Sequence, residues 1–543
     1  MVFARRSTTL LAAIIASCAM VLSLTACTSD NKTVVDGQTT VTSNSAGGVA
    51  VFTPSDGITL NQQTPLNKWA KLVHDLTKAL VDAGFKKGDI DHTTSDSLDK
   101  QSRAIQDFVV DHLSNNTTDD SGIAIAPDNM TLLVAPVVEA DASTRQYGDY
   151  VSQNLSTNDA TDEGATSDGE SSEDDSSKDD SSNTESDSTA SDEQAQAVDR
   201  LVSSLKLAKE SGMHVVLLGN SIEGYKPDAF VKFSDAQTIG KLQAEKMVSK
   251  LKLDKVSKDN PKYIEVLLPY TAMDEKGNAN DSTFAQEAFR GIWQVLGSYY
   301  QKGVVESPSG TLDGKSTEND WQAVAYDAAK EGSTAKVLDK RLAKTDGQST
   351  LTRIDGIITM NDYIASEVVK ELDDLGYTGS AADINPQITI SGIVGNITGK
   401  KDLSRDAVPD PIKSPENDNA NDSSSSDDDA DKDTSASDKD RDSQWPLVTG
   451  YGAYVSNIPS IVNGKQWMTG MEDRQTIATD IAQACAKLNK DEALNSMPSI
   501  RNSEVGGVKK IPTINEPLLA VSAGNLKSAL IDPGYISLAD AGL

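Results

Sequence analysis

One stretch of the sequence carries the pattern that decides the fold: Arg353-Ile-Asp-Gly-Ile-Ile-Thr-Met-Asn-Asp-Tyr-Ile-Ala-Ser-Glu-Val-Val-Lys-Glu-Leu-Asp-Asp-Leu-Gly-Tyr377. Its first part, 354–360, is mostly apolar and of strand length, whereas its second part repeats apolar residues at helical spacing. Asn361 and Asp362 lie in the polar turn between the two parts. Ligands of open parallel sheets bind at the carboxyl ends of the strands, where such turns lie. The turn therefore has two interpretations, a helix cap or part of a ligand site.

The same alternation of strands and helices runs through most of the chain. Buried-type strands that alternate with helices predict parallel sheets covered on both faces. There are too many such units for one sheet, so we expect two α/β lobes. The expected strands are 49–53, 90–93, 130–136, 214–218, 229–233, 263–268, 303–307, 354–360, 387–394, 446–450 and 467–469, and the expected helices are 67–84, 97–113, 194–211, 236–251, 285–301, 321–331, 364–375, 458–463 and 474–488.

Two segments hold much of the acidic charge of this 543-residue chain, whose net charge is -32. Residues 158–193 contain 14 acidic residues and one lysine, and residues 416–442 contain 11 acidic and three basic residues. Both are rich in Ser, Asp and Glu and nearly free of apolar residues, so they cannot bury enough surface to offset ordering entropy. We expect disordered acidic inserts at about 151–194 and 402–444. The acidic balance also argues against nucleic acid as a partner, because phosphate binding needs basic patches.

The N-terminal sequence predicts export and lipid attachment. An Arg-Arg pair at 5–6 precedes an apolar segment, 10–24, which is too short for a stable membrane-spanning helix. The following Leu-Thr-Ala-Cys27 resembles a bacterial lipobox, which implies a signal peptide at 1–27 and a lipid on Cys27. An ordinary secretory signal with a chance cysteine is the alternative. Residues 28–48 then form a flexible tether, and the expected location is the outer face of the cytoplasmic membrane.

The cysteines and histidines predict no chemistry of their own. Cys18 lies in the signal and Cys27 is the expected anchor, so Cys485 is the one thiol left and cannot form an internal disulfide. Its spacing from Ile477 and Ile481 is helical, which favours a core position. The four histidines show no metal-ligand spacing, and no nucleophile elbow, P-loop or dinucleotide fingerprint occurs. We therefore expect no enzymatic activity, no metal and no cofactor.

A set of local motifs occurs in one order along the chain. They are Leu66-Asn-Lys-Trp-Ala-Lys71, Leu133-Val-Ala-Pro136, Phe233-Ser-Asp-Ala-Gln-Thr-Ile-Gly-Lys-Leu-Gln-Ala244, Thr359-Met-Asn-Asp362, Gly464-Lys-Gln-Trp-Met-Thr469 and Asn515-Glu-Pro-Leu-Leu519, followed by Asn525-Leu526 and Pro533-Gly-Tyr535. Each motif is weak alone, but their collinear order resembles the type I periplasmic-binding-protein superfamily. Within it the resemblance is to the sugar-binding branch that includes the xylose and multiple-sugar receptors. It covers residues 49–543 apart from the acidic inserts.

The resemblance implies an α/β fold of two Rossmann-like lobes joined by a three-crossover hinge, which closes around a ligand in the cleft. Lobe one would comprise 49–230 and 470–512, and lobe two would comprise 231–469 and 513–543. The implied function is a lipid-anchored extracellular substrate-binding protein of an ABC-type importer, with a sugar or small glycan as ligand. Its partners would be a membrane permease and an ATPase, and a monomer is expected.

Sugar recognition selects the candidate ligand-binding residues. Planar polar groups bond pairs of hydroxyls, and an aromatic ring covers the apolar face of a sugar. Asn361 and Asp362 match the family turn that contacts sugar hydroxyls. Trp69 is a candidate aromatic platform, with a core aromatic as the alternative interpretation. Lys68 stands where the family often has Arg, which loses the bidentate fork.

Several positions depart from the family pattern. Gly219 and Asn220 fall on its Asp-Arg pair, Gly452 falls on its strand-end carboxylate, and Glu472 replaces its Lys. The loop 269–283 is longer than in the family, and its candidate substitutes for the missing polar groups are Asp274, Asn278, Asn280 and Asp281. Asn220 and Asp281 are therefore added to the candidate ligand-binding residues. Because most of a monosaccharide site is rewritten, the alternative function is an envelope sensor or scaffold with a degenerate cleft, acting through protein contacts.

Overall fold

The computed structural model divides by its internal contacts into two units, Met1–Asn44 and Ser45–Leu543. The first unit contains an antiparallel hairpin of β1 (Thr33–Val35) and β2 (Gln38–Thr40). All elements named below belong to the second unit. The described residues are 33–35, 38–40, 46–56, 65–115, 125–138, 144–156, 185–273, 280–343, 351–381 and 445–543.

Some sequence predictions fall outside the described residues. These are the lipid attachment at Cys27, the strand at 387–394, the loop residues Asp274 and Asn278, and most of both acidic segments. Within the residues that are described, no helix is long and apolar enough to cross a membrane.

A seven-stranded sheet, in the order β17-β18-β9-β7-β5-β3-β4, forms the first α/β layer. Its neighbours pair in parallel, except for the antiparallel hairpin of β17 and β18. The sequence analysis did not predict this hairpin. Exposed polar residues separate its apolar residues, and nearby prolines interrupt the segment, so no strand pattern is evident. The strands are β3 (Gly48–Pro54), β4 (Ile90–Ser95), β5 (Met130–Val134), β7 (His214–Leu218), β9 (Ala229–Lys232), β17 (Ile500–Val505) and β18 (Val508–Asn515).

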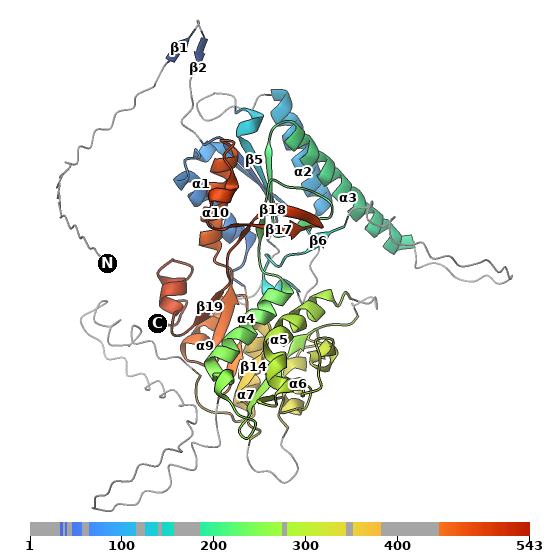
Figure 1. The fold of residues 1–543 in the computed structure, drawn as a ribbon, viewed down its shortest axis with the longest axis vertical. Coiled ribbons are helices and arrows are strands. Elements are labelled where there is room, and N and C mark those ends of the chain that lie inside the picture. Colours follow the sequence, from blue (N-terminus) through green and yellow to red (C-terminus); the bar gives the residue numbers. More distant parts are fainter. Residues whose placement is uncertain are drawn as a thin grey trace, which may run out of the picture. The chain divides into compact units, whose positions relative to one another are not determined.

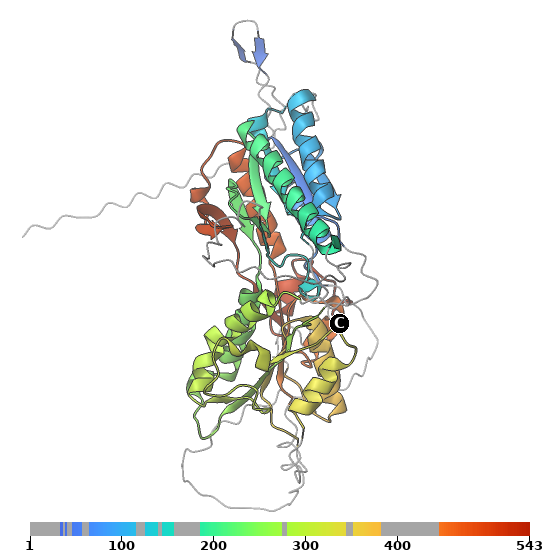
Figure 2. The same ribbon diagram turned by 90° about the vertical axis from the view of Figure 1, so that its right-hand side faces the viewer.

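Helices cover both faces of this sheet. Helices α1 (Trp69–Asp82) and α10 (Arg474–Leu488) pack together on one face. Helices α2 (Leu98–Asn115) and α3 (Glu185–Glu210) run side by side on the other face (Figures 1 and 2). Alternate residues of β3, β5, β7 and β9 supply the two cores, as expected for buried parallel strands. Cys485 is fully buried in the core under α10, which confirms its predicted core position.

The first acidic insert is narrower than predicted. Residues 151–156 belong to the fold, since Val151 and Leu155 are buried and Asn154–Leu155 form β6. At its other end α3 begins at Glu185 rather than at Gln194. Acidic residues are favourable at a helix N-terminus because they complement the positive end of the helix dipole. The prediction from composition alone therefore started the insert too early and ended it too late.

A four-stranded, fully parallel sheet forms the second α/β layer, in the order β12-β10-β14-β15. Helices α4 and α5 pack on one face, and α6 and α7 pack on the other (Figure 1). The prediction of parallel α/β layers is thereby confirmed. The elements are β10 (Lys262–Val266), β12 (Val305–Glu306), β14 (Gly356–Ile358), β15 (Leu447–Thr449), α4 (Ala236–Leu251), α5 (Thr283–Gln301), α6 (Ser333–Arg341) and α7 (Asp362–Asp374).

Two glycines let α4 and α5 approach closely. A Cβ on Gly240 would lie 2.2 Å from the Ala288 carbonyl oxygen, and a Cβ on Gly291 would lie 2.0 Å from the Gln237 carbonyl oxygen. Neither neighbour is a flexible side chain, so backbone would have to shift. The close approach of α4 and α5 therefore depends on the absence of a side chain at these two positions.

The predicted helix at 321–331 is wrong. The chain forms a single 3-10 turn, Asp320–Ala323, and then a short strand, β13 (Ala325–Tyr326), which pairs with β11 (Leu268–Pro269). Apolar residues at Trp321, Val324 and Ala328 have helical spacing, but Trp321 and Val324 pack in one core cluster and Ala328 packs against another. The helix that follows is α6, which the sequence did not predict.

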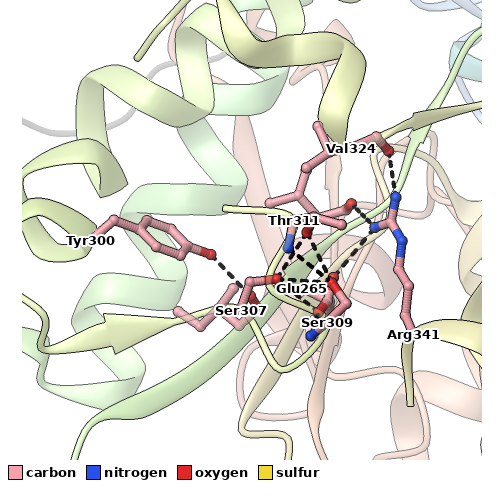
Figure 3. A network of polar contacts seen from close by, with 9 residues as sticks. Glu265, Tyr300, Ser307, Ser309, Thr311, Val324 and Arg341 are labelled. Carbon is pink, nitrogen blue, oxygen red and sulfur yellow. Dashed lines mark hydrogen bonds and ion pairs between the residues drawn. The ribbon is translucent and has the colours of Figure 1, made fainter. Parts of the chain in front are cut away.

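A buried ion pair fixes α6 against the sheet (Figure 3). Arg341 Nη1 lies 3.3 Å from Glu265 Oε2, and the same guanidinium donates to the carbonyls of Val266 and Val324. The other carboxylate oxygen of Glu265 accepts from the Ser307 hydroxyl and from the Ser309 backbone N–H, both at 2.8 Å. Burial of an ion pair is tolerated when the remaining donors and acceptors are bonded in this way. We therefore assign this network to the fold.

Two further strand pairs lie outside these sheets. β8 (Ser221–Ile222) pairs in parallel with β6, on connections that belong to the seven-stranded sheet. β16 (Met468–Met471) pairs in antiparallel fashion with β19 (Leu519–Ser522), and both of these strands lie on connections between the two sheets. The predicted helix at 458–463 is α9 (Ile458–Val462).

Candidate functional site

Asn361 caps helix α7 and also reaches a distant segment. Its Oδ1 accepts a hydrogen bond of 2.9 Å from the backbone N–H of Ile364, so the cap interpretation is confirmed. Its Nδ2 donates to Gln146 Oε1 at 3.0 Å. The side chain is fully buried. Both ends of the amide therefore have protein partners.

Asp362 is enclosed by the elements around its turn. Its Oδ1 accepts from Gln466 Nε2 at 2.7 Å, and its Oδ2 accepts from the Tyr454 backbone N–H and the Thr469 hydroxyl, each at 2.9 Å. Burial raises the pKa of this carboxyl to about 6, although these hydrogen bonds lower it. A Cβ on Gly450 would lie only 2.2 Å from Asp362 Oδ1. Both oxygens of the carboxyl thus have protein partners, and these bonds hold the turns after β14 and β15 together.

Lys68 and Trp69 begin helix α1, and both contact Asp149. Lys68 Nζ lies 2.9 Å from Asp149 Oδ1, and the Trp69 backbone N–H donates to Asp149 Oδ2 at 3.2 Å. The Trp69 ring packs edge-on against Tyr150 and Phe233, with centroids 5.1 and 5.8 Å away. Because Trp69 is only 3% exposed, the ring is a core aromatic, as the alternative interpretation proposed.

Asn220 follows β7 and is buried at the carboxyl end of that strand. Its Oδ1 accepts from the Gln153 backbone N–H, and its Nδ2 donates to the Pro136 carbonyl, each at 2.9 Å. The amide thereby joins the ends of β5 and β7 to the chain at Gln153.

Asp281 lies apart from this group. Its Oδ1 accepts from the backbone N–H and the hydroxyl of Thr283, at 2.9 and 2.7 Å, at the start of α5. Asn280, its neighbour, donates to the Thr271 carbonyl. Among the described residues, the hydrogen bonds of Asp281 are made only within its own exposed turn. The structure therefore does not bring Asp281 together with the other five candidates.

The other candidates share a partner that the sequence did not reveal. Asn361, Lys68, Trp69 and Asn220 all contact residues 144–153, which we call the cleft segment. Only Asp362, the fifth member of the group, is held by other elements. The cleft segment follows β5 and precedes β6, and it has no apolar periodicity that would have marked it as buried.

Two tyrosines anchor the cleft segment in different cores. Tyr147 is 1% exposed and packs with Phe284 and Tyr451, in the core cluster of the four-stranded sheet. Tyr150 is equally buried and packs with Trp69 and Phe233, in a core cluster of the seven-stranded sheet. The cleft segment therefore joins the two α/β layers through its side chains.

Tyr451 is the centre of a second polar cluster that the sequence did not predict. Its hydroxyl lies 2.5 Å from the Ser234 hydroxyl, 3.2 Å from Asn67 Nδ2 and 3.4 Å from Glu472 Oε1. These residues come from four separate connections: the ends of β9, β15 and β16 and the approach to α1. Glu472 was noted only as a departure from the family pattern. Sequence separations of this size leave no local signal.

Glu472 is a buried carboxyl with a shifted pKa. Burial raises its pKa to about 7, which hydrogen bonds from Ser234 and Tyr451 oppose and nearby Asp235 reinforces. The Ser234 backbone N–H donates to Glu472 Oε1 at 2.5 Å. Asn67 Oδ1 is buried without a hydrogen-bond partner among the described residues. This cluster therefore combines a buried carboxyl of raised pKa with a buried amide oxygen that lacks a partner among the described residues.

A cavity of about 570 Å³ lies away from these residues, on the outer side of α1 and the edge strand β4. Its lining includes Val73, His74, Thr77 and His92, and it contains none of the six candidates. In the described part of the chain, no group of three or more His, Cys, Asp or Glu is arranged to hold a metal ion.

The site as a whole is a polar and aromatic cluster at the carboxyl ends of parallel strands, which is the usual place for ligands in open α/β sheets. No protein-family model matches this chain, and no curated protein matches it. Among solved structures, the chain is similar to an ABC transporter solute binding protein from Clostridium phytofermentans with bound β-D-glucose. The identity is 17%, the match covers 91% of this chain and 99% of that chain, and the TM-score is 0.44.

Two further solved structures show a similar level of likeness. A carbohydrate transporter solute binding protein from Chloroflexus aurantiacus, in complex with D-glucose, is 18% identical over 92% of this chain and 98% of that chain, with a TM-score of 0.42. A periplasmic ribose ABC transporter protein from Conexibacter woesei is 13% identical over 90% of this chain and 96% of that chain, with a TM-score of 0.42. Identities and TM-scores this low transfer neither a ligand nor an activity to this chain.

Proposed function

We propose that this protein is an extracytoplasmic solute-binding protein whose ligand is a sugar or small glycan. In this proposal Cys27 carries a lipid anchor. The partner is an ABC-type importer, whose permease receives the ligand and whose ATPase drives transport. The observation that carries the proposal is the convergence of Lys68, Asn220 and Asn361 on one segment at the carboxyl ends of parallel strands. An ammonium and two amides are suitable partners for ligand hydroxyls, and they come from three separate strand or helix ends.

The connections between the sheets support a two-lobe arrangement. After β9 the chain enters α4 on the other sheet, after β16 it enters α10, and after β18 it enters β19. Three such connections agree with the three-crossover hinge that the family resemblance implies, and connecting residues of this kind absorb the bending when two lobes close. We propose that the seven-stranded and four-stranded layers are the two lobes and that these three connections bend when ligand binds.

The candidate residues have different roles in this proposal. Lys68, Asn220 and Asn361 exchange their bonds to the cleft segment for bonds to the ligand. Asp362 is a positioning residue, because its carboxyl is enclosed by Tyr454, Gln466 and Thr469 and orients the turn that presents Asn361. Trp69 supports the site from the core rather than stacking on the ligand.

Isothermal titration calorimetry of the chain from residue 28 onward tests this function. D-glucose, D-ribose and L-arabinose are suitable probes, and we expect saturable one-site binding of at least one of them. Asn361→Ala should weaken that binding, whereas Asp281→Ala, remote from the group, should not. No heat with any sugar, from the folded wild type and from folded variants in which the cleft segment is weakened, would reject the receptor function.

A second function, an envelope sensor or scaffold, is favoured by one specific observation. The candidate groups of Lys68, Asn220 and Asn361 are already bonded to the chain's own cleft segment. If the cleft segment stays bonded to these groups, no ligand can bind them, and the protein would act through contacts of its surface with other proteins. Silence across the sugar panel, combined with an intact fold by circular dichroism, would support this alternative.

A further inference from the structure

We infer that the cleft segment, residues 144–153, is an intramolecular occupant of the ligand site and that an external ligand binds by displacing it. This inference rests on the proposed solute-binding function and adds how that site is regulated. It follows from what the cleft segment contacts, from how it is held, and from where it is attached.

The backbone of the cleft segment is bonded in the way a bound peptide is bonded. The Asp149 N–H donates to the Asn67 carbonyl at 2.9 Å, and the Ser152 N–H donates to the Ser234 carbonyl at 3.0 Å. The Gln153 N–H donates to the side chain of Asn220 at 2.9 Å. These acceptors belong to three different connections near the strand ends. The cleft segment therefore uses groups that a ligand at this place would use.

Its side chains also occupy the positions of ligand groups. The Asp149 carboxylate lies against Lys68 Nζ and the first N–H of α1, which together form an anion-binding environment. The Tyr150 ring lies against both Trp69 and Phe233, and its hydroxyl donates to the Lys68 carbonyl. An acid and a ring on adjacent residues thus fill a polar and an aromatic subsite at once.

The other end of the cleft segment closes the opposite side of the site. Gln146 accepts from Asn361 through its side chain and from the Tyr454 hydroxyl through its carbonyl, at 3.0 and 2.7 Å. Tyr147 fills the space against Phe284 and Tyr451. The cleft segment is thereby bonded to both α/β layers, which is the relation that a ligand has to a closed two-lobe receptor.

The attachment of the cleft segment allows it to leave without unfolding a sheet. At one end β6 pairs with β8 and holds Asn154 and Leu155 in place. At the other end, seven residues, 137–143, separate Pro136 from Thr144. β5 does not have to move when the cleft segment withdraws, because the seven residues before Thr144 make a connection longer than a tight turn, and β6 remains paired with β8.

Displacement lowers the apparent affinity by the fraction of molecules in which the site is free. Variants that weaken the cleft segment should therefore bind sugar more tightly than the wild type. The release variant is Tyr147→Ser with Tyr150→Ser, and a milder one is Asp149→Asn, which keeps the shape of the side chain. The matched control is Tyr299→Ser. Tyr299 lies on α5, away from the cleft segment, and its hydroxyl donates to Asp254.

Calorimetry with D-glucose, D-ribose and L-arabinose then decides the matter. We expect the release variant, or Asp149→Asn if the double variant does not fold, to bind one sugar about ten-fold more tightly than wild type and Tyr299→Ser. Equal affinity in all folded variants would overturn the inference while leaving the receptor function intact. Silence of every folded variant would overturn the receptor function and the inference together.

Hydrogen exchange of the full chain provides an independent readout. Saturation with the sugar that binds should speed exchange of the Asp149, Ser152 and Gln153 amides, because their acceptors are released from the cleft segment. Slower or unchanged exchange at these three amides on sugar binding would overturn displacement.

Discussion

Asn361 Nδ2 donates a 3.0 Å hydrogen bond to Gln146 Oε1, a partner 215 residues earlier in the chain. The same amide caps α7 through its oxygen. One side chain thus sets the local turn with one atom and joins that turn to the cleft segment with the other. The fold and the candidate site meet in this residue.

Asn361→Ala should lower the free energy of unfolding by about 1–2 kcal/mol, because the helix loses its cap and a buried hydrogen bond. Asn361→Asp should restore most of the cap, since a carboxylate oxygen also accepts from the Ile364 N–H. Urea unfolding of both variants measures the difference. Equal stability of the Ala variant and wild type would contradict the role of the cap.

Asp362→Ala should cost more, about 3 kcal/mol, because it removes the buried carboxylate that accepts hydrogen bonds from Gln466, Tyr454 and Thr469 together. Gln466→Ala removes only one of these donors and serves as a comparison. Urea unfolding of both proteins checks the order of the two effects. A loss of less than about 1 kcal/mol in Asp362→Ala would show that the enclosure described here contributes little.

Glu472 should make stability depend on pH in a defined direction. Its pKa is raised from 4.5 to about 7 in the folded protein, so the folded state holds the proton more tightly than the unfolded state. This contribution is fully present below pH 4.5 and is lost as the pH rises through 7. The unfolding free energy of wild type relative to Glu472→Gln should therefore fall by about 3 kcal/mol across that window.

Urea unfolding of wild type and Glu472→Gln at several pH values between 4.5 and 7 provides this measurement. The Gln variant cannot titrate at this position, so the other acidic residues cancel in the difference. A difference that stays constant with pH, or grows in favour of wild type as the pH rises, would contradict the assigned shift.

Gly148 should tolerate no side chain. Its φ is 99°, and a Cβ would lie 2.6 Å from Asn67 Cβ and 2.9 Å from the Asn67 carbonyl oxygen. Gly376 is a matched control, because its φ is 90° and a Cβ there would meet nothing within 4 Å. Gly376→Ala should cost about 1 kcal/mol from the backbone conformation alone, and Gly148→Ala should cost clearly more.

Thermal unfolding of the two alanine variants compares them directly. Because Gly148 lies in the cleft segment, the Gly148→Ala variant should also show faster proteolysis near residues 144–153. Equal costs for the two variants would mean that Asn67 yields and that the cleft segment packs loosely.

Much of the fold could be predicted because periodicity is a local property. Helices α4 and α10 have the predicted bounds, 236–251 and 474–488, since each has buried residues at helical spacing and an Asp that caps its first turn. The helix predicted at 321–331 rested on the same kind of evidence, helical spacing of apolar residues, and was wrong. Its apolar spacing is helical, but Tyr326 pairs in a strand and Gly332 starts a new helix, so tertiary pairing prevails over spacing.

The site was predictable only in part. The strand-end argument found Asn361 and Asp362, and the family resemblance added Asn220. All three lie where turns follow parallel strands. It missed the cleft segment, because Gln-Tyr-Gly-Asp-Tyr has no period and borders an acidic tract. Its contacts with Asn67, Lys68 and Trp69 span about 80 residues, and no local pattern encodes pairings at that distance.

Calorimetric titration of the chain from residue 28 onward with D-glucose, D-ribose and L-arabinose, with wild type beside Asp149→Asn, tests the central claim most directly. The predicted result is saturable one-site binding of at least one sugar, with the tighter constant in Asp149→Asn. No heat from any sugar in either folded protein would contradict the account.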